Sequence, residues 1–443
     1  MLRVSPGPPV CSSVSAPCQP GSTITAPCAM AVLLDLLHGC PHEDQLLLLQ
    51  DSDLHVFLLT ADPEQRSFLP DQTPVIVLEQ RSPARALYGL KLRLDQLQLS
   101  RVRVVTSPRG RGQLARYQQL LFTAVYTFDY TEVLEDKSTC PSCGGHAHPD
   151  SPAGSVQEDV SALVQQLPAL GGDMRVLTSA LIPDCFGHGF STRAGGVSCI
   201  PTLSSLNLFS SSRRRDPPAV VMENRRRLAL HAGFHPLPLR LVKVNHASDV
   251  WVLGKAEPES YDAMVTDQPG VVLAAPGADC MPILFADPVR KVIGAAHAGW
   301  KGTVMGVAMA TVNAMVTDLG SRLSDIVVAV GPAVGVCCFT LDREQALDFT
   351  SIHPDCVPDP ESARPHVDIR LANRVLLQRG GILPEHIHDN AVTNQPCISP
   401  CTSCHPKDFF SHVRDGLNFG TQVGFLWIRG TEDHAGPLAS QTG

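Results

Sequence analysis

The chain has 443 residues, of which 44% are hydrophobic and 18% are charged. A chain of this length and composition is globular and can bury the cores of two or three domains. Its net charge of −8 argues against a nucleic-acid-binding protein that relies on bulk electrostatic attraction, because neutralising phosphates requires a basic face. We therefore expect small molecules or proteins as partners.

The sequence also indicates where the protein resides. No stretch approaches the ~18 consecutive apolar residues that span a membrane, and residues 1–29 lack the apolar core of a signal peptide. We therefore predict a cytoplasmic protein, with nuclear or organelle association as an alternative, and a disordered extension at residues 1–29. The odd number of cysteines, 15 in a long chain without a secretion signal, favours reduced thiols over a disulfide framework.

Residues 30–135 predict a small α/β domain. The expected strands are "VFLLT" (56–60), "PVIVL" (74–78) and "RVRVVTS" (101–107). Ser82 followed by Pro83 marks the start of a helix, since leucines then recur at helical spacing. A second helix is expected over 113–128. No catalytic motif is visible in this domain, and self-association or contacts with metabolic proteins are the roles open to it.

Residues 136–156 are rich in Gly, Pro and Ser and predict a linker. Residues 157–430 are expected to form a larger second domain, followed by a tail at 431–443. Its expected helices are 158–170 and 303–318, the latter capped by Thr303, and its expected strands are 174–182, 239–245, 271–275, 281–286, 291–296 and 326–330. Interleaved strands and helices favour a mixed α/β fold class.

Two histidines and one cysteine stand at the ends of three of these apolar runs. His246, Cys280 and His297 each end or closely follow a predicted strand and have small residues beside them. Three strand ends can converge at one rim, and two imidazoles with one thiolate suit a catalytic Zn²⁺, which keeps a fourth position open. The alternative is three buried structural side chains.

Five blocks of sequence carry a resemblance to a known family. They are "HGFSTRAGGVS" (188–198), "GADCMPILFAD" (277–287), "AAHAGWKG" (295–302), "VGPAVGVCCF" (330–339) and "FFSHVRDGLNFG" (409–420). In this order they closely resemble the family labelled multicopper polyphenol oxidoreductase or laccase domain, over residues 177–430. The resemblance implies a layered α/β/β/α catalytic domain after a smaller N-terminal α/β domain. It also implies that His246, Cys280 and His297 are both the zinc ligands and the catalytic residues.

The same resemblance implies an activity. Family members resemble zinc-dependent purine nucleoside phosphorylases, which implies phosphorolysis of adenosine, inosine, guanosine and S-methyl-5′-thioadenosine, together with adenosine deamination. The N-terminal unit followed by this domain further resembles the vertebrate branch of the family. That branch is linked to macrophage metabolism and inflammation, and it suggests fatty-acid synthase as a partner. A homo-oligomer is a further expectation.

Phosphate binding requires a cation, for which the sequence offers three candidates. Arg193 in "STRAGG" and Arg414 in "SHVRDG" are the best, because a guanidinium binds phosphate oxygens through a bidentate fork. The alternative for each is a surface ion pair. Lys301 is a weaker third candidate and is expected to be solvated.

The family label raises the alternative of copper chemistry. A four-copper laccase needs about ten histidines, largely in HxH pairs, since copper sites are rich in imidazole. HxH occurs here only at His146/His148 and His386/His388, outside the shared blocks. Zinc is therefore favoured over copper. A copper-dependent phenol oxidoreductase and a non-catalytic metabolic adaptor stay as the alternative functions.

Several other side chains have two interpretations. Cys280 is either a metal ligand or a nucleophile activated by a neighbouring histidine, and Asp279 either orients an imidazole or caps a turn. Cys337 and Cys338 are expected to pack in the core. We expect the cysteines of "CISPCTSCH" (397–405) to have a positional role and those of "CPSCGGHAH" (140–148) to lie in a loop without a specific function. The basic cluster "SSSRRRDPP" (210–218) is expected to form a solvated, charged face.

Overall fold

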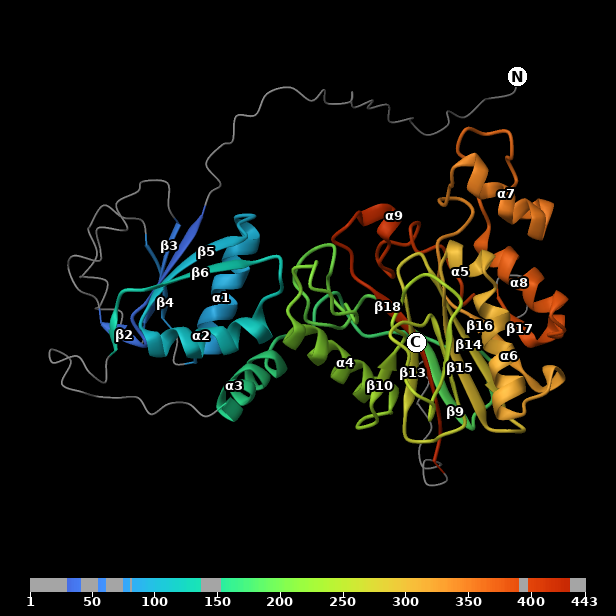
Figure 1. Ribbon diagram of the computed structural model, residues 1–443, viewed down its shortest axis with the longest axis horizontal. Helices are drawn as coiled ribbons and strands as arrows, with labels where there is room; N and C mark the ends of the chain where they lie inside the picture. The colour runs from blue at the N-terminus through green and yellow to red at the C-terminus, as the bar shows by residue number, and fades with distance from the viewer. Residues whose placement is uncertain are drawn as a thin grey trace, which may run out of the picture.

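The computed structural model describes residues 30–40, 55–60, 75–79, 82–136, 153–389 and 397–430. Figure 1 shows a smaller N-terminal part, built around one sheet, beside a larger part in which two sheets pack face to face. The predicted extension at 1–29, residues 137–152 of the predicted linker and the predicted tail at 431–443 lie outside the described residues.

The N-terminal part is built on a five-stranded parallel sheet. Its strand order is β4 (Val75–Glu79), β3 (His55–Thr60), β1 (Ala31–Asp35), β5 (Arg101–Thr106) and β6 (Thr127–Glu132). The central strand β1 is buried along its whole length, as expected for a parallel strand covered on both faces. The short strands β2 (Gly39–Cys40) and β7 (Glu135–Asp136) pair separately.

The helices of this part begin at Ser-Pro pairs. α1 (Pro83–Gln96) starts where Ser82 Oγ accepts a hydrogen bond from the Arg85 N–H, as predicted. α2 (Pro108–Leu121) starts in the same way at Ser107. The predicted helix over 113–128 is therefore wrong in its bounds, because Thr127 already belongs to β6. α3 (Ala153–Gln165) begins five residues before its predicted start.

The larger part contains two sheets. The first has the order β10 (Leu239–Leu241), β13 (Val272–Gly277), β18 (Gln422–Ile428), β9 (Phe186–Ser191) and β8 (Val176–Leu177). The second has the order β11 (Val250–Val252), β12 (Ala263–Thr266), β15 (Val292–Ala298), β14 (Met281–Asp287), β16 (Val327–Val330) and β17 (Ile387–His388). Buried side chains from both sheets, among them Phe190, Leu273 and Leu284, form the core between them.

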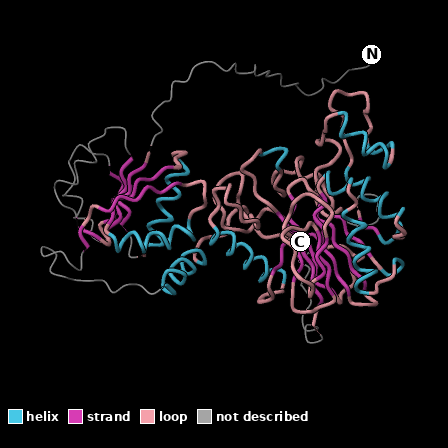
Figure 2. The backbone as a smooth tube through the Cα atoms, viewed as in Figure 1, coloured by secondary structure: helices cyan, strands magenta, loops and turns pink. Residues whose placement is uncertain are grey.

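Helices cover the two outer faces. α4 (Pro218–Ala232) packs on the first sheet through Leu228 and Ala229. α6 (Val307–Leu319) packs on the second sheet, α8 (Ile369–Arg379) packs against α6, and α7 (Arg343–Ile352) packs against α8. Figure 2 shows helices on this outer side of the strands. This α/β/β/α layering, beside a smaller α/β unit, confirms the predicted fold class. α4 also packs against α2 and α3, so the two parts share a core.

Glycine divides the long helix that was predicted over 303–318. The structure has α5 (Trp300–Val304) and then α6, separated by Gly306 at φ 80°, a left-handed conformation that glycine adopts without a steric penalty. Thr303 is therefore not a cap, and its hydroxyl accepts a hydrogen bond from the Asn373 amide. The remaining short helices are η4 (Leu323–Asp325), η5 (Pro354–Cys356), η6 (Pro384–His386) and α9 (His412–Asp415).

The described residues bear on two expectations from the sequence, the absence of a membrane span and the reduced state of the cysteines. Among the described helices, none has the length and apolarity needed to cross a membrane. Nine described cysteines carry free thiols, but Cys40 is disulfide-bonded, so the expectation of reduced thiols fails at that residue.

Candidate metal centre and its pocket

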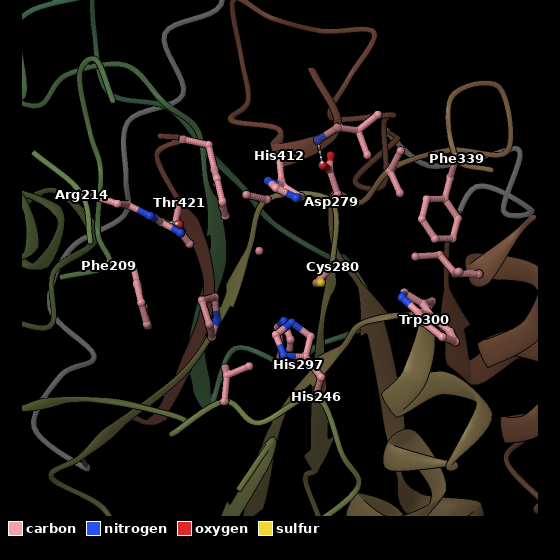
Figure 3. Close-up of a pocket in the computed structure, with 18 residues that line it drawn as sticks. Phe209, Arg214, His246, Asp279, Cys280, His297, Trp300, Phe339, His412 and Thr421 are labelled. Atoms are coloured by element: carbon pink, nitrogen blue, oxygen red, sulfur yellow. Dashed lines mark hydrogen bonds between the residues drawn. The ribbon is translucent and has the colours of Figure 1, made fainter. Parts of the chain in front are cut away.

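Three separated segments bring His246, Cys280 and His297 together. His246 lies in the loop between β10 and β11, Cys280 directly precedes β14, and His297 lies in β15, opposite Pro282 of β14. Potential ligand atoms of the three side chains all lie within 4.8 Å of one another. Figure 3 shows the two imidazoles and the Cys280 thiol close together among the residues that line a cavity. The structure thus makes this donor set available to a single ion.

Because Gly299 has no side chain, the side chains of His246, Cys280 and His297 have room to lie close together. A Cβ atom placed there would lie 3.1 Å from Cys280 Sγ and 3.3 Å from His246 Cδ2. The glycine has φ −73°, a conformation open to any residue, so backbone strain does not explain it. Its role is to leave the three donors space to converge.

Asp262 is a functional residue that the sequence analysis missed. Its buried carboxylate accepts a hydrogen bond from His297 Nδ1 at 2.8 Å, and it also accepts the backbone N–H groups of Asn245, His246 and Ala247. It therefore orients one imidazole and fixes the loop that carries the other. By holding the proton on Nδ1 of His297, it leaves Nε2 to face an ion. Asp262 precedes β12 without any motif that would have marked it.

The three side chains shift one another's pKa. Burial alone would raise the pKa of the Cys280 thiol, but the charge of His297 and hydrogen bonds from both histidines lower it to about 6. Burial alone would lower the pKa of His297, but the Cys280 thiolate and Asp262 raise it to about 9. Without a metal, the centre is therefore a thiolate–imidazolium pair at neutral pH, and a thiolate is the form that binds metal or reacts.

The cavity that contains this centre has a volume of about 350 Å³. Its walls carry four aromatic rings, from Phe209, Trp300, Phe339 and Phe419, and its polar groups include Arg214, His412 and Thr421. In Figure 3, Phe209 and Arg214 lie on one side of Cys280, and Trp300 and Phe339 lie on the other. Apolar walls with a few polar groups are typical of a small-molecule site, and flat rings suit an aromatic ligand.

Arg214 provides the cation of this cavity. Within the described part of the chain, the only hydrogen-bond acceptor of its guanidinium is Thr421 Oγ1, and the only carboxylate whose charge acts on it, that of Asp216, makes no ion pair with it. The group lies 3.9 Å from the centroid of the Phe419 ring. Burial lowers the pKa of Arg214 to about 10, which still leaves it cationic at neutral pH. A partly buried cation without a carboxylate partner favours an anionic ligand.

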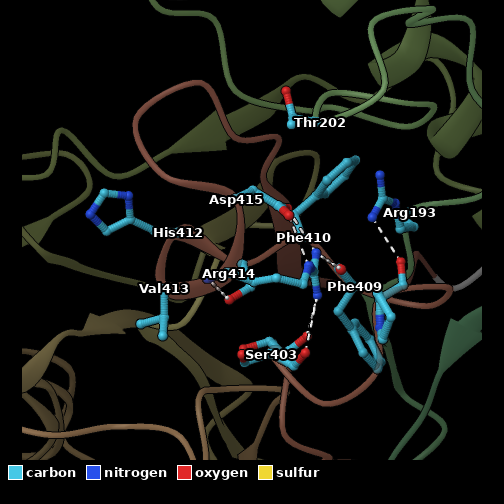
Figure 4. A network of polar contacts seen from close by, with 12 residues as sticks. Arg193, Thr202, Ser403, Phe409, Phe410, His412, Val413, Arg414 and Asp415 are labelled. Carbon is cyan, nitrogen blue, oxygen red and sulfur yellow. Dashed lines mark hydrogen bonds and ion pairs between the residues drawn. The ribbon is translucent and has the colours of Figure 1, made fainter. Parts of the chain in front are cut away.

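Figure 4 shows Arg193 and Arg414 within a network of polar contacts. The Arg193 guanidinium donates to the carbonyls of Ser204, Pro406 and Pro201. The Arg414 guanidinium donates to both oxygens of Asp415 and to the carbonyls of Thr402, Ser403 and Phe409. Neither side chain lines the cavity. Their guanidinium donors instead hold together the loops around residues 201–204 and 402–415.

The other candidate residues have identifiable contacts. The described hydrogen bonds of the Asp279 carboxylate come from Thr402 Oγ1 and the Val413 N–H rather than from an imidazole, and they tie two loops to the strand end at Cys280. Lys301 is exposed and lies over the Trp300 ring. His386 and His388 bond to the Ile326 carbonyl and the Ser179 hydroxyl. His146 and His148 lie outside the described residues, as do the cysteines of 140–148.

Two packed sheets hold the His/Cys/His group in the wall of an aromatic cavity. This arrangement defines an α/β/β/α protein whose cavity can bind a small ligand beside a set of potential metal ligands. The comparisons with known proteins agree. The family described as multi-copper polyphenol oxidoreductase laccase matches residues 187–429, more than half of the chain. The chain belongs to this family.

Individual relatives have informative names. The mouse protein called purine nucleoside phosphorylase LACC1 is 52% identical over 349 residues, covering 78% of this chain and 80% of the relative. The adenosine deaminase RL5 of an unknown prokaryotic organism is 30% identical over 248 residues, covering 53% of this chain and 90% of its own length. The crystal structure of the hypothetical protein YfiH of Bacillus licheniformis has a TM-score of 0.50 and 28% identity, covering 55% of this chain and 93% of that one.

Proposed function

We propose that this chain is a zinc-dependent purine nucleoside enzyme. It cleaves adenosine, inosine, guanosine and S-methyl-5′-thioadenosine with phosphate, giving the free base and the corresponding ribose 1-phosphate, and it also deaminates adenosine. The observation that carries the proposal is the convergence of His246, Cys280 and His297 within 4.8 Å, beside a cavity with aromatic walls. The names of the mouse and prokaryotic relatives support both reactions.

The residues present fit a zinc ion. Two imidazole nitrogens and one thiolate are common ligands of catalytic zinc, and three protein ligands leave a position for water or substrate. Asp262 supplies the carboxylate–histidine hydrogen bond that often supports such ligands. When bound there, zinc lowers the pKa of a water molecule towards ~7 and polarises an oxygen or nitrogen of the substrate.

The residues that line the cavity suggest where the nucleoside and the phosphate bind. The cavity is large enough for a nucleoside, and the rings of Phe209, Trp300 and Phe339 offer faces to a purine. Arg214 binds the phosphate anion through the donors that Thr421 does not use. Nucleoside and phosphate are thereby held in one cavity, between the aromatic walls and the metal centre.

Phosphorolysis then needs one bond exchange and one proton. A phosphate oxygen forms a bond to C1′ of the sugar while the bond from C1′ to N9 of the purine breaks, and the electron pair of that bond goes to the purine. His412 lines the same cavity, and the Gly416 carbonyl is bonded to its Nδ1. We assign His412, in its imidazolium form, to donate the proton on its Nε2 to the departing purine, which leaves a neutral imidazole whose remaining proton stays on Nδ1, bonded to the Gly416 carbonyl. In deamination, water adds at C6 of adenosine and ammonia leaves.

The decisive experiment incubates purified full-length protein with adenosine, with and without phosphate, and identifies the products by mass spectrometry. Adenine with ribose 1-phosphate, formed only with phosphate, indicates phosphorolysis, and inosine indicates deamination. Cys280→Ala should abolish both. If all three products are absent while the protein is folded and loaded with zinc, the proposed function is wrong.

The alternative functions predict different measurements. A copper-dependent phenol oxidoreductase would purify with several copper ions per chain, whereas we expect zinc. A non-catalytic adaptor would keep every cellular output after Cys280→Ala. A cytoplasmic role in macrophage metabolism and inflammation, with fatty-acid synthase as a partner and with homo-oligomers, belongs to this proposal and is tested by co-purification from macrophages and by the mass of the protein in solution.

A further inference from the structure

Four cysteines gather in a second place, apart from His246, Cys280 and His297. Cys337 and Cys338 follow β16 in a loop, and Cys401 and Cys404 lie in the loop after residues 397–400. Their sulfur atoms all lie within 4.8 Å of one another. From the sequence, Cys337 and Cys338 were expected to pack in the core after a strand, and Cys401 and Cys404 were expected to have a positional role within the family's closing block.

The distances fit donors arranged around one ion. Cys404 Sγ lies 3.5 Å from Cys337 Sγ and 3.3 Å from Cys338 Sγ. These separations exceed the ~2.05 Å of a disulfide bond, and the four thiols are free. Four sulfurs on a tetrahedron with zinc–sulfur bonds of ~2.3 Å lie roughly 3.7 Å from one another, so small shifts of flexible side chains would complete the coordination.

The backbone around the four cysteines is arranged to support this cluster. The Gly335 N–H donates to Cys401 Sγ at 3.2 Å, a contact that stabilises a thiolate. A Cβ atom on Gly335 would lie 3.2 Å from Cys337 Sγ and 3.5 Å from Cys401 Sγ, so this glycine leaves room for both sulfurs. The two loops also pair directly, through a β-bridge between Ala333 and Cys401 and a hydrogen bond from the Thr402 N–H to the Ala333 carbonyl.

We propose that Cys337, Cys338, Cys401 and Cys404 form a second metal site, which binds one Zn²⁺ through four thiolates and fixes one wall of the cavity. Four thiolates with no open position are typical of a structural zinc site, in contrast to the three-ligand centre at Cys280. The proposal does not depend on the nucleoside chemistry, since it concerns metal binding alone.

The position of the cluster explains how such an ion would act on the cavity. Val334 and Phe339, which flank the first cysteine pair, both line the cavity. The Val334 N–H donates to the carbonyl of Asp279, and Thr402, next to Cys401, donates its hydroxyl to the Asp279 carboxylate. Asp279 directly precedes Cys280. An ion held by the four thiolates therefore ties together the two loops that support the strand end carrying the Cys280 thiol.

Metal content tests the proposal in the full chain. We expect about two zinc ions per wild-type chain by mass spectrometry of the metals, about one after Cys401→Ser with Cys404→Ser, and about one after Cys280→Ala with His297→Ala. Cys397→Ser, at an exposed thiol of the same segment outside the cluster, should keep about two. An unchanged zinc content in the Cys401/Cys404 double variant overturns the proposal, as does iron or no metal at all in the Cys280/His297 double variant.

A second measurement on wild-type protein covers the case in which the double variant does not fold. The zinc-loaded protein is treated with N-ethylmaleimide before and after chelation, and modified peptides are identified by mass spectrometry. We expect all four cluster thiols to be protected by zinc and to react together after chelation, while Cys397 reacts throughout. Equal reactivity of the four with and without zinc, or a disulfide between Cys338 and Cys404 in place of the metal, contradicts the proposal. Neither measurement uses catalytic activity, so a failure of the proposed enzyme function would be seen separately.

Discussion

At the scale of single residues, the charge of Cys280 is set by its neighbours. The pKa of its thiol is lowered to about 6 although burial opposes this shift. A lowered pKa means that the thiolate is present above pH ~6 and is lost as the pH falls through that value, whereas an ordinary cysteine becomes a thiolate only near pH 8.5. The metal-free protein should therefore expose an unusually reactive thiol, and metal should mask it.

Alkylation measures this directly. In metal-free protein, the rate at which iodoacetamide modifies Cys280 should rise around pH 6 and stay level above pH 7, whereas the rate for free cysteine in the same buffer should still rise between pH 7 and pH 9. His297→Ala should move the Cys280 profile to higher pH, since it removes the largest lowering influence. The assigned thiolate–imidazolium pair is refuted if Cys280, followed by peptide mass spectrometry, gives the same profile as free cysteine.

The arginines permit a second test at this scale. Arg214→Gln removes the only cavity guanidinium among the described residues and should raise the KM for phosphate at least ~10-fold, because a charged hydrogen bond contributes ~1.5–3 kcal/mol. Its thermal stability should change little. Arg193→Gln removes three bonds to backbone carbonyls and should instead lower the Tm with a smaller effect on that KM. If Arg193→Gln raises the KM for phosphate more than Arg214→Gln does, Arg193 rather than Arg214 binds phosphate.

At the scale of elements, the sequence predicted a helix or strand correctly where the residues that determine it lie within a few positions of one another. Ser82 and Pro83 gave the start of α1 correctly, and Ser107 and Pro108 carry the same signal for α2, which the apolar pattern further along obscured. Gly306 divides the long helix because its left-handed backbone is compatible with a helix start and not with a continuous helix. The apolar runs at β13 to β16 were predicted to within a few residues, since strands buried on both faces need continuous apolar sequence.

The site was predictable in part for the same reason. His246, Cys280 and His297 each mark the end of a strand-like run or lie within one, so their convergence could be anticipated. Asp262, Arg214 and the four-cysteine cluster could not, because each depends on contacts between segments far apart in sequence. Arg214 in particular is hidden within "RRR", where only the fold distinguishes it from its neighbours.

The turn between β15 and α5 contains Gly299, whose lack of a side chain should matter for metal binding. Gly299→Ala places a methyl group about 3.1 Å from Cys280 Sγ and 3.3 Å from His246 Cδ2, closer than side chains normally approach. The donors must separate, so we expect zinc affinity at this centre to fall at least ~10-fold in a competition assay with a chelating dye. Gly89→Ala in α1, where a Cβ atom has no neighbour within 4 Å, is the control and should leave zinc binding unchanged. Equal affinity in the two variants would show that the space at Gly299 does not serve the metal.

At the scale of the whole molecule, consecutive arginines connect the two parts. Arg214 lines the cavity, and Arg215 donates to the Asp95 carboxylate, the Leu99 carbonyl and the Ser100 hydroxyl of the N-terminal part. Its guanidinium also lies 5.2 Å from the centroid of the Tyr126 ring. The N-terminal part therefore holds the chain at the residue next to the proposed phosphate ligand, which gives this part a role in the site without a catalytic motif.

Arg215→Ala tests this connection. Loss of three hydrogen bonds, one of them to a carboxylate, should lower the free energy of unfolding by ~2–4 kcal/mol. The substitution should also raise the KM for phosphate several-fold, because the backbone that positions Arg214 is no longer fixed. Arg213→Ala, at the exposed arginine on the other side of Arg214, is the matched control and should change neither quantity. If Arg215→Ala destabilises the protein but leaves the KM for phosphate unchanged at a temperature where it is folded, the N-terminal part stabilises the catalytic part without shaping its cavity.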